Sequence, residues 1–306
     1  MKIADICSAD TGGQSFKLSR AITEYTEHTS RSFRKANNYL DFPGDITSNS
    51  FDKDFVTKYM AEVDIIHCHN MYRYANGWGK INPNAKWLIH QHGRLGDDKS
   101  LKAYESADKQ RGAKRFVSTI NLLRYVHDDP SRWIPAPIRV SEFDQLKAQF
   151  YNPVDPINKV RIAHSPTNRN YKNTDLLIEI ISKIPRAELV LIEGKPNKEC
   201  LELRASCDIT FDQMHLCYGN SGLEGMAFRQ PTIVGMDDSV RKDINSIVGY
   251  EPFIYATPGT LEQVIKDLVY DEELRMKWGN VGRKYIEDWH DDKKIAIKMI
   301  EIYKNL

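Results

Sequence analysis

The sequence predicts an α/β protein made of two lobes, each built on a doubly wound parallel sheet. Strand-like apolar runs alternate with helical stretches along the whole chain, which is typical of a parallel sheet covered by helices on both faces. Residues 151–158 contain two prolines and show no periodicity, as expected of a linker. The 306 residues are enough for two lobes with a core each. We expect these lobes to cover residues 1–152 and 153–306.

The first lobe opens with an apolar run at residues 3–7, followed by a glycine loop at Gly12 and Gly13 and by apolar residues at helical spacing over residues 16–25. This order predicts a strand, a tight loop and a helix. Further strands are predicted at residues 63–68, 87–90 and 116–119, and a helix at residues 51–61.

The second lobe repeats this alternation, with strands predicted at residues 160–163, 189–192, 209–211 and 232–234. The clearest helix carries its apolar residues on one face, at Leu176, Leu177, Ile180, Ile181 and Ile184. Other helices are predicted at residues 200–207, from about residue 222, and at residues 261–268 and 295–303. We expect the last helix to lie across the lobe interface and cross back to the first lobe.

Composition excludes several classes of protein. Lys and Arg number 43 against 42 Asp and Glu, so no strong overall field attracts nucleic acid. The mean hydropathy of -0.54 and the lack of a long apolar run argue against a membrane-spanning helix. Asp5 stands where a signal peptide needs its apolar core. The five cysteines form no C-x-x-C pair and are expected to be free thiols. We expect a cytoplasmic protein, and peripheral attachment to a membrane stays open.

One candidate binding segment covers residues 164–175, between a predicted strand and the amphipathic helix. Ligands of open parallel sheets bind beyond the carboxyl ends of the strands. Here Asn168, Arg169 and Lys172 combine short polar groups and two cations with a helix N-terminus, which suits a phosphate group. A capped loop with solvated Arg and Lys side chains is the alternative interpretation.

A second candidate segment is the glycine loop at residues 218–225, which precedes a predicted helix with Glu224 in its first turn. A carboxylate repels phosphate, but it accepts two hydrogen bonds from a ribose diol. Simple compensation of the helix dipole is an equally good explanation for Glu224.

These segments, taken with four others in the same order, resemble glycosyltransferase family four. The C-terminal match consists of Tyr218-Gly219, then Gly222-Leu223-Glu224-Gly225-Met226-Ala227, then Gln230-Pro231. The other matches are Thr11-Gly12-Gly13, Asp64-Ile65-Ile66-His67-Cys68-His69, His92-Gly93, Ile134-Pro135-Ala136-Pro137 and Lys172-Asn173-Thr174-Asp175. The resemblance therefore spans nearly the whole chain.

The resemblance implies a GT-B fold, in which two Rossmann-like domains face a central cleft. The N-terminal domain would bind the acceptor, and the C-terminal domain would bind a nucleotide diphosphate sugar, with UDP and GDP as the expected nucleotides. It further implies transfer to a hydroxyl with retention of configuration, no metal and no cofactor. The departing diphosphate would itself accept the proton of the acceptor, while fixed cations and helix N–H groups stabilise its charge. The acceptor, whether a saccharide or a lipid-linked group, is not identified.

By position, the resemblance assigns Glu224 to the ribose hydroxyls, Lys172 and Arg169 to the diphosphate, and His92 to the donor sugar. The resulting set comprises the catalytic candidates His92, Lys172 and Arg169 and the donor-binding candidates Gly12, Gly13, Asn168, Tyr218, Gly219, Asn220, Ser221, Gly222, Leu223 and Glu224. Two positions depart from the family pattern. Leu216 stands where the family commonly has a first glutamate, and Thr167 stands where its phosphate-binding arginine usually lies, so Arg169 would have to substitute.

Three alternatives stay open. Two imidazoles on each of two strands, at His67, His69, His90 and His92, could form the metal site of a hydrolase. No carboxylate ligand is expected near them, because Asp64 at the start of its strand would point away. A sugar-nucleotide epimerase with a GT-B fold and a non-catalytic nucleotide-sugar-binding protein are the others. The motifs of serine hydrolases, P-loop kinases and dinucleotide enzymes are absent. Tyr72, Arg73, Tyr74 and Trp78 are either acceptor contacts or core residues.

Overall fold

The computed structural model describes residues 1–10, 12–37, 40–47, 52–70, 80–93, 98–153, 159–215 and 217–306. The chain divides into two compact units. The first contains Met1–Pro137 together with His290–Leu306, and the second contains Ile138–Trp289. In the part of the chain that is described, no helix is both long and apolar enough to cross a membrane.

The first unit is built on a parallel sheet of six strands in the order β3-β2-β1-β4-β5-β6. The strands are β1 (Lys2–Cys7), β2 (Thr29–Arg34), β3 (Ile46–Thr47), β4 (Ile65–His69), β5 (Lys86–Gln91) and β6 (Lys114–Val117). The 3-10 turns Ile120–Val126 and Pro130–Arg132 follow β6.

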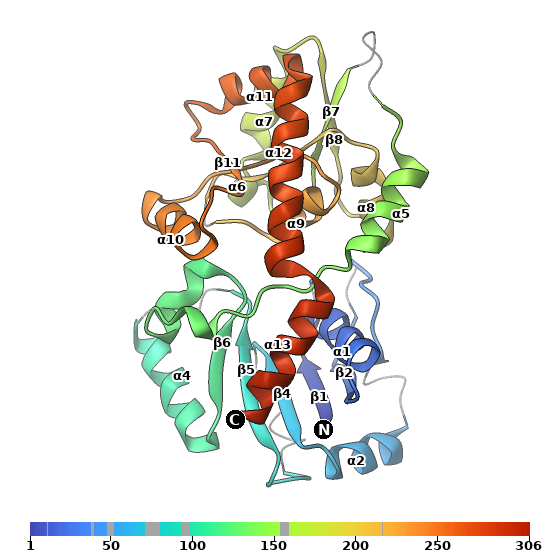
Figure 1. Ribbon diagram of the computed structural model, residues 1–306, viewed down its shortest axis with the longest axis vertical. Helices are drawn as coiled ribbons and strands as arrows, with labels where there is room; N and C mark the ends of the chain where they lie inside the picture. The colour runs from blue at the N-terminus through green and yellow to red at the C-terminus, as the bar shows by residue number, and fades with distance from the viewer. Residues whose placement is uncertain are drawn as a thin grey trace. The chain divides into compact units, whose positions relative to one another are not determined.

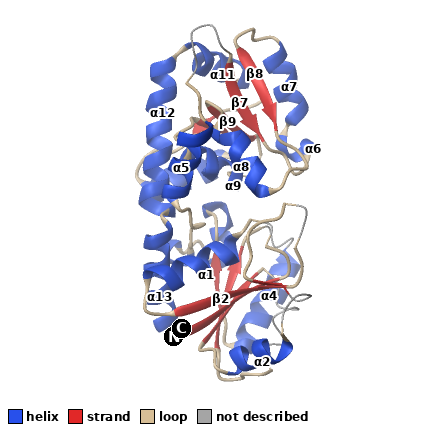
Figure 2. Ribbon diagram, turned by 90° about the vertical axis from the view of Figure 1, so that its right-hand side faces the viewer, coloured by secondary structure: helices blue, strands red, loops and turns tan. Residues whose placement is uncertain are grey.

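Helices cover both faces of this sheet (Figures 1 and 2). The helices α1 (Gln14–Tyr25) and α13 (Asp292–Lys304) pack on the face that contains Ile3, Ile65 and Leu88. The helices α2 (Lys53–Ala61) and α4 (Asp98–Arg111) pack on the opposite face. Because successive side chains of a strand point to opposite faces, the apolar residues of β1 and β4 contribute to a core on each side of the sheet.

The last helix, α13, belongs to the first unit and lies against α1 (Figure 1). Met299 and Tyr303 of α13 are buried in the same cluster as Leu18 and Ile22 of α1. The chain therefore does return to the unit that contains its N-terminus.

The second unit is built on a parallel sheet of five strands in the order β11-β10-β9-β7-β8. Its strands are β7 (Val160–His164), β8 (Ala187–Leu191), β9 (Ile209–Gln213), β10 (Thr232–Val234) and β11 (Ile254–Tyr255). Its helices are α5 (Val140–Phe150), α6 (Arg169–Lys172), α7 (Thr174–Ser182), α8 (Asn197–Ala205), α9 (Asn220–Ala227), α10 (Asp238–Val248), α11 (Leu261–Tyr270) and α12 (Glu272–Tyr285). The predicted α/β class with two parallel sheets is confirmed.

The division between the units falls after Pro137, earlier than the predicted boundary at residues 152 and 153. The physical reason is that α5 packs on the second unit, where the rings of Phe143 and Phe228 lie 4.8 Å apart. Lys147 Nζ also donates a hydrogen bond to the Phe228 carbonyl oxygen at 2.6 Å. Part of the predicted linker, residues 154–158, lies outside the described residues.

Strand β2 has no counterpart among the predicted strands. Its sequence, Thr-Ser-Arg-Ser-Phe-Arg, is mostly polar, yet Ser30 and Ser32 are buried. Their hydroxyls bond to Asp5 at 2.5 Å and to Ser15 at 2.8 Å. Helices α10 and α12 were not predicted either.

Gly225 allows α9 to lie directly against β9. A Cβ atom at this position would lie 2.6 Å from the Cβ of buried Thr210. We expect Gly225→Ala to lower the free energy of unfolding by about 1–3 kcal/mol, because the helix must shift to relieve the overlap. Urea denaturation measures this change, with Gly259→Ala as the matched control, since its nearest atom, Thr257 Oγ1, would be 3.9 Å away. Equal stability of the two variants would contradict the prediction.

Candidate functional site

The carboxylate of Asp212, near the end of β9, anchors the glycine loop of the second unit. It is almost completely buried and accepts hydrogen bonds from the Gly219 amide at 2.6 Å and from Ser221 Oγ at 2.5 Å. A Cβ atom at Gly222 would lie 2.9 Å from Asp212 Oδ2. The loop can therefore approach the carboxylate this closely only with glycine at position 222.

Lys172 reaches the same carboxylate from the other candidate segment. Asn168 caps α6 by accepting the Tyr171 amide at 3.2 Å, and Asn173 ends α6 in the left-handed conformation. This short helix directs Lys172 Nζ to Asp212 Oδ1 at 2.6 Å. The structure therefore brings together the two segments that the sequence analysis singled out, through an aspartate that it did not.

The pKa of Asp212 reflects opposing effects. Burial alone raises it, but the Lys172 ammonium and the hydrogen bonds from Ser221 and Gly219 outweigh burial and hold the pKa below its usual value of 3.8. Asp212 is therefore a carboxylate at neutral pH.

Glu224 lies beyond the first turn of α9, because the helix begins at Asn220 rather than near Gly222 as predicted. This weakens the explanation of Glu224 as compensation of the helix dipole, an effect confined to the first turn. Its side chain is buried, and its Oε2 lies 3.5 Å from Nε of the fully buried Arg204. Arg204 in turn donates to Ser165 Oγ in the loop after β7. Sequence analysis overlooked Arg204 because it looks like an ordinary polar residue of α8.

Arg169 points to a different partner. Its guanidinium forms a two-pronged ion pair with Glu193, at 2.8 Å from Nε and 2.6 Å from Nη2. About half of its side chain is exposed.

The aromatic ring of Tyr218 belongs to the core of the second unit. It stacks on Phe253 at 4.8 Å, and the Tyr285 hydroxyl donates to its hydroxyl at 3.0 Å. The backbone of residues 219–223 is thus the part of the predicted loop that borders Asp212. Leu216 lies outside the described residues.

In the first unit, Asp10 shapes the predicted glycine loop. Its carboxylate accepts the amides of Gln14 at 2.7 Å and Phe16 at 3.0 Å at the start of α1. Gly13 has φ 65, and a Cβ there would lie 2.7 Å from Phe42 Cδ1. Glycine is required for both reasons. Thr11, Tyr72, Arg73, Tyr74 and Trp78 lie outside the described residues.

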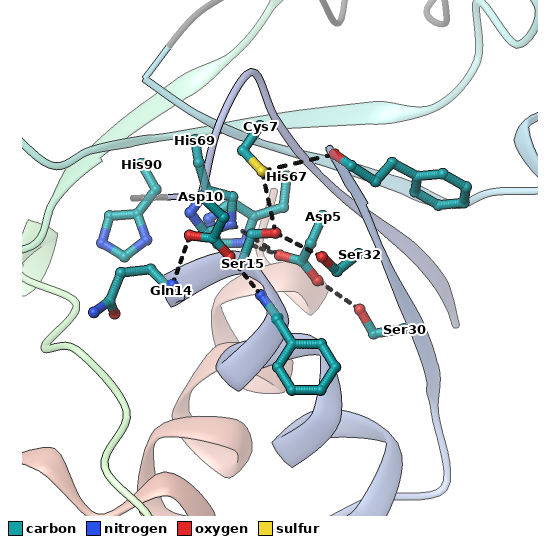
Figure 3. Close-up of polar contacts among 12 residues, drawn as sticks. Asp5, Cys7, Asp10, Gln14, Ser15, Ser30, Ser32, His67, His69 and His90 are labelled. Atoms are coloured by element: carbon teal, nitrogen blue, oxygen red, sulfur yellow. Dashed lines mark hydrogen bonds and ion pairs between the residues drawn. The ribbon is translucent and has the colours of Figure 1, made fainter. Parts of the chain in front are cut away.

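His92 follows β5 and lies against His69 and His90. Its Nε2 lies 2.7 Å from His69 Nδ1. The Nε2 atom of His69 lies 3.1 Å from the carboxylate of Asp5 (Figure 3). His67 and His90 lie beside them, as the sequence pattern predicted. Asp5 was missed because it is distant in sequence, although it pairs with His67 across adjacent strands.

Burial dominates the electrostatics of this cluster. It raises the pKa of Asp5, against the effect of the hydrogen bond from His69. It also lowers the pKa of His67 and of His90 well below 6.5. The imidazoles of His67 and His90 are therefore neutral at neutral pH.

No family model matches the chain, and no curated protein matches it significantly in sequence. Solved structures do match it in fold. Sucrose-phosphate synthase (tll1590) from Thermosynechococcus elongatus has a TM-score of 0.70 at 16% identity, over 99% of this chain and 98% of that one. Anabaena Alr3699/HepE, in complex with UDP and glucose, has a TM-score of 0.68 at 14% identity over the whole of both chains.

An alpha-glucosyltransferase, in complex with UDP and DNA containing an HMU base, has a TM-score of 0.68 at 12% identity, over 99% of this chain and 98% of that one. The chain therefore has the fold of the GT-B glycosyltransferases.

The Lys172–Asp212 pair predicts a specific dependence of stability on pH. We expect Asp212→Asn to lower the free energy of unfolding at neutral pH by about 3–5 kcal/mol, because one partner of a buried ion pair is lost. Since folding lowers the pKa of Asp212, its contribution is complete above the usual value of 3.8 and disappears as the pH falls through the lower folded-state value. Urea denaturation from pH 7 down to pH 3 measures the difference between wild type and variant.

Asp175→Asn provides the control, because this side chain is 82% exposed. We expect it to change stability by less than about 0.5 kcal/mol at either pH. If the difference in unfolding free energy between wild type and Asp212→Asn is the same at pH 3 as at pH 7, the carboxylate charge is not the source of the stabilisation.

Proposed function

We propose that this protein is a glycosyltransferase that binds a nucleotide diphosphate sugar through its second unit. It transfers the sugar, with retention of configuration, to an acceptor hydroxyl. One observation carries the proposal: Asp212 binds both Lys172 and the glycine loop at the start of α9. Glu224 lies one turn further along this helix. A cation and a helix N-terminus suit a diphosphate, and a nearby carboxylate suits a ribose diol.

In this proposal Lys172 stays paired with Asp212 while it binds the donor. An ammonium group has three hydrogens, and the bond to Asp212 uses one of them. The others are available to the diphosphate, whose negative charge grows as the sugar departs. Because Asp212 fixes the position of the ammonium group, little reorganisation accompanies that step.

Arg169 pairs with Glu193 through Nε and Nη2, so Nη1 is the atom that would contact the diphosphate while this ion pair persists. The resemblance assigns His92 of the first unit to the donor sugar. UDP is the first nucleotide to test, because two structures with this fold contain it. Saccharide and lipid-linked hydroxyls are the acceptor classes that we propose. Neither donor binding nor sugar transfer requires a metal ion at the diphosphate in this proposal.

An epimerase is the second candidate function. A putative UDP-N-acetylglucosamine 2-epimerase from Listeria monocytogenes also shares the fold, with a TM-score of 0.58 at 15% identity. An epimerase converts the donor without any acceptor, whereas a glycosyltransferase releases the nucleotide. A non-catalytic binder, suggested by Leu216, would show affinity without turnover.

Glu224→Gln tests the proposed donor site. The substitution preserves shape but removes the charge that receives the ribose hydroxyls, and hydrogen bonds to charged groups contribute about 1.5–3 kcal/mol each. We therefore expect the Kd of the preferred nucleotide sugar to rise about 10–100-fold. Calorimetric titration of UDP, GDP, ADP and dTDP sugars into both proteins measures the change, and chromatography of the products separates nucleotide release from epimerisation.

Glu199→Gln is the matched control, because Glu199 is a half-exposed carboxylate on α8 that pairs with Lys195. It should bind the donor as the wild type does. If no nucleotide sugar binds the wild type, or if Glu224→Gln binds as tightly as Glu199→Gln, the proposed donor site is wrong.

A further inference from the structure

Five polar side chains gather on one face of the sheet of the first unit. Asp5 of β1 pairs in register with His67 of β4, and His69 of β4 pairs with His90 of β5. Because alternate residues share a face, these four side chains point to the same side. His92 comes directly after the end of β5. The exposed fractions of Asp5, His67, His69 and His90 are 0%, 0%, 4% and 1%. Figure 3 shows His67 and His69 between Asp5 and His90.

Each of three imidazoles is held through one of its nitrogens. His69 Nε2 lies 3.1 Å from Asp5 Oδ1, and His67 Nδ1 lies 3.3 Å from the same oxygen and 2.6 Å from the Tyr303 hydroxyl. His90 Nε2 lies 3.2 Å from the Ile134 carbonyl oxygen. Carboxylates and carbonyls only accept hydrogen bonds, so His69 Nε2 and His90 Nε2 carry the hydrogen and their Nδ1 atoms present lone pairs. A ligand on His67 Nε2 would place the hydrogen of that ring on Nδ1, which faces Asp5 and the Tyr303 hydroxyl.

Two ring nitrogens, His67 Nε2 and His90 Nδ1, are buried and have no hydrogen-bond partner in the part of the chain that the structure describes. The Nδ1 atom of His69 faces His92 Nε2 at 2.7 Å. One nitrogen from each of His67, His69 and His90 lies within 4.8 Å of the others. Leaving a buried polar atom without a partner costs about 1–3 kcal/mol. A metal ion bound to these nitrogens would remove that cost.

The buried carboxylate of Asp5 has no lysine or arginine as an ion-pair partner in the described part of the chain. Among the described residues, its ion-pair partners are His67 and His69. Ser30 Oγ donates to its other oxygen, which satisfies a hydrogen bond but not the charge. A positive ion among the imidazoles would compensate the carboxylate and the two unpartnered nitrogens together.

We propose that His67, His69 and His90 bind a divalent transition metal, with Zn²⁺ as the ion that the donor set fits best. Neutral imidazole nitrogens are preferred zinc ligands. Metal-binding histidines almost always donate their second ring N–H to a carboxylate or a backbone carbonyl, as Asp5 and Ile134 provide here. Bonds of about 2.0–2.1 Å require the rings to turn inward from their present separation. His92 is the fourth candidate ligand, through the Nε2 that now faces His69.

The prediction of no metal came from the family resemblance, and the alternative of a metal site at the histidines was disfavoured because no carboxylate ligand is close to them in sequence. Strand pairing supplies Asp5, which holds the ligands rather than binding the ion. The ion would connect β4 to β5 within the first unit, through three histidines that the proposed donor site does not use. This inference therefore does not depend on the proposed function.

Metal analysis of the untagged full-length protein tests the inference. The protein is stripped with a chelator, incubated with Zn²⁺, freed of excess ion by gel filtration and analysed by inductively coupled plasma mass spectrometry. We expect one zinc ion per chain and a melting temperature that rises with the concentration of Zn²⁺, because the ion binds only the folded protein. The proposal is overturned if the folded protein contains no zinc and its melting temperature does not change with the concentration of Zn²⁺.

Two variants locate the site. His67→Gln/His90→Gln should lose the zinc, whereas His127→Gln should retain it, because the His127 side chain is 89% exposed and far from the cluster in sequence. Asp5→Asn keeps every ligand and should raise the Kd of zinc about 10–100-fold. Circular dichroism establishes that each variant is folded. If the double variant does not fold, Asp5→Asn decides the question, and an unchanged Kd there would contradict the role of Asp5.

Discussion

A buried carboxylate must be satisfied by the protein, and in the second unit this constraint falls on Asp212. Its partners come from three places: the Lys172 ammonium at the end of α6, the Gly219 amide in the loop, and the Ser221 hydroxyl in the first turn of α9. Loss of Lys172 leaves the charge without compensation, and loss of either neutral donor leaves a buried oxygen short of a hydrogen bond. The position of the loop, the start of α9 and the direction of Lys172 are therefore fixed by one side chain of β9.

The first unit meets the same constraint with different chemistry. Asp5 also lies on a central strand and is also buried, but no lysine or arginine is among its ion-pair partners in the described residues. Serine hydroxyls and imidazoles take that place, Ser30 from β2 and His69 from β4. An ion pair and an imidazole cluster are two ways to keep an acidic group in a parallel sheet. The second leaves two buried ring nitrogens, on His67 and His90, without a hydrogen-bond partner among the described residues.

The sequence was most informative where apolar periodicity reports burial directly. The helix predicted around Leu177 and Ile180 is α7, and the apolar runs near residues 65, 160 and 233 are β4, β7 and β10. Strand β2 could not be found in this way, because its buried serines serve Asp5 and Ser15 rather than an apolar core. The prolines that suggested a boundary after residue 152 carry no information about α5, which packs back on Phe228.

The candidate site was predictable only in outline. Glycine spacing and local charge located Lys172 and Glu224, but Asp5, Asp212 and Arg204 act through strand order and helix packing, which the order of residues along the chain does not reveal. The start of α9 was placed too late because its N-cap residue is Gly219, which has no side chain that could mark the beginning of the helix.

The return of α13 to the first unit has a consequence for how the chain acquires its structure. His67 meets Tyr303 across a sequence separation of 236 residues, with the entire second unit encoded between them. During synthesis on the ribosome, the apolar face of α1 therefore stays exposed until α13 has emerged. The second unit, which is contiguous in sequence, can fold before that moment. The unit made first is thus the last to be completed.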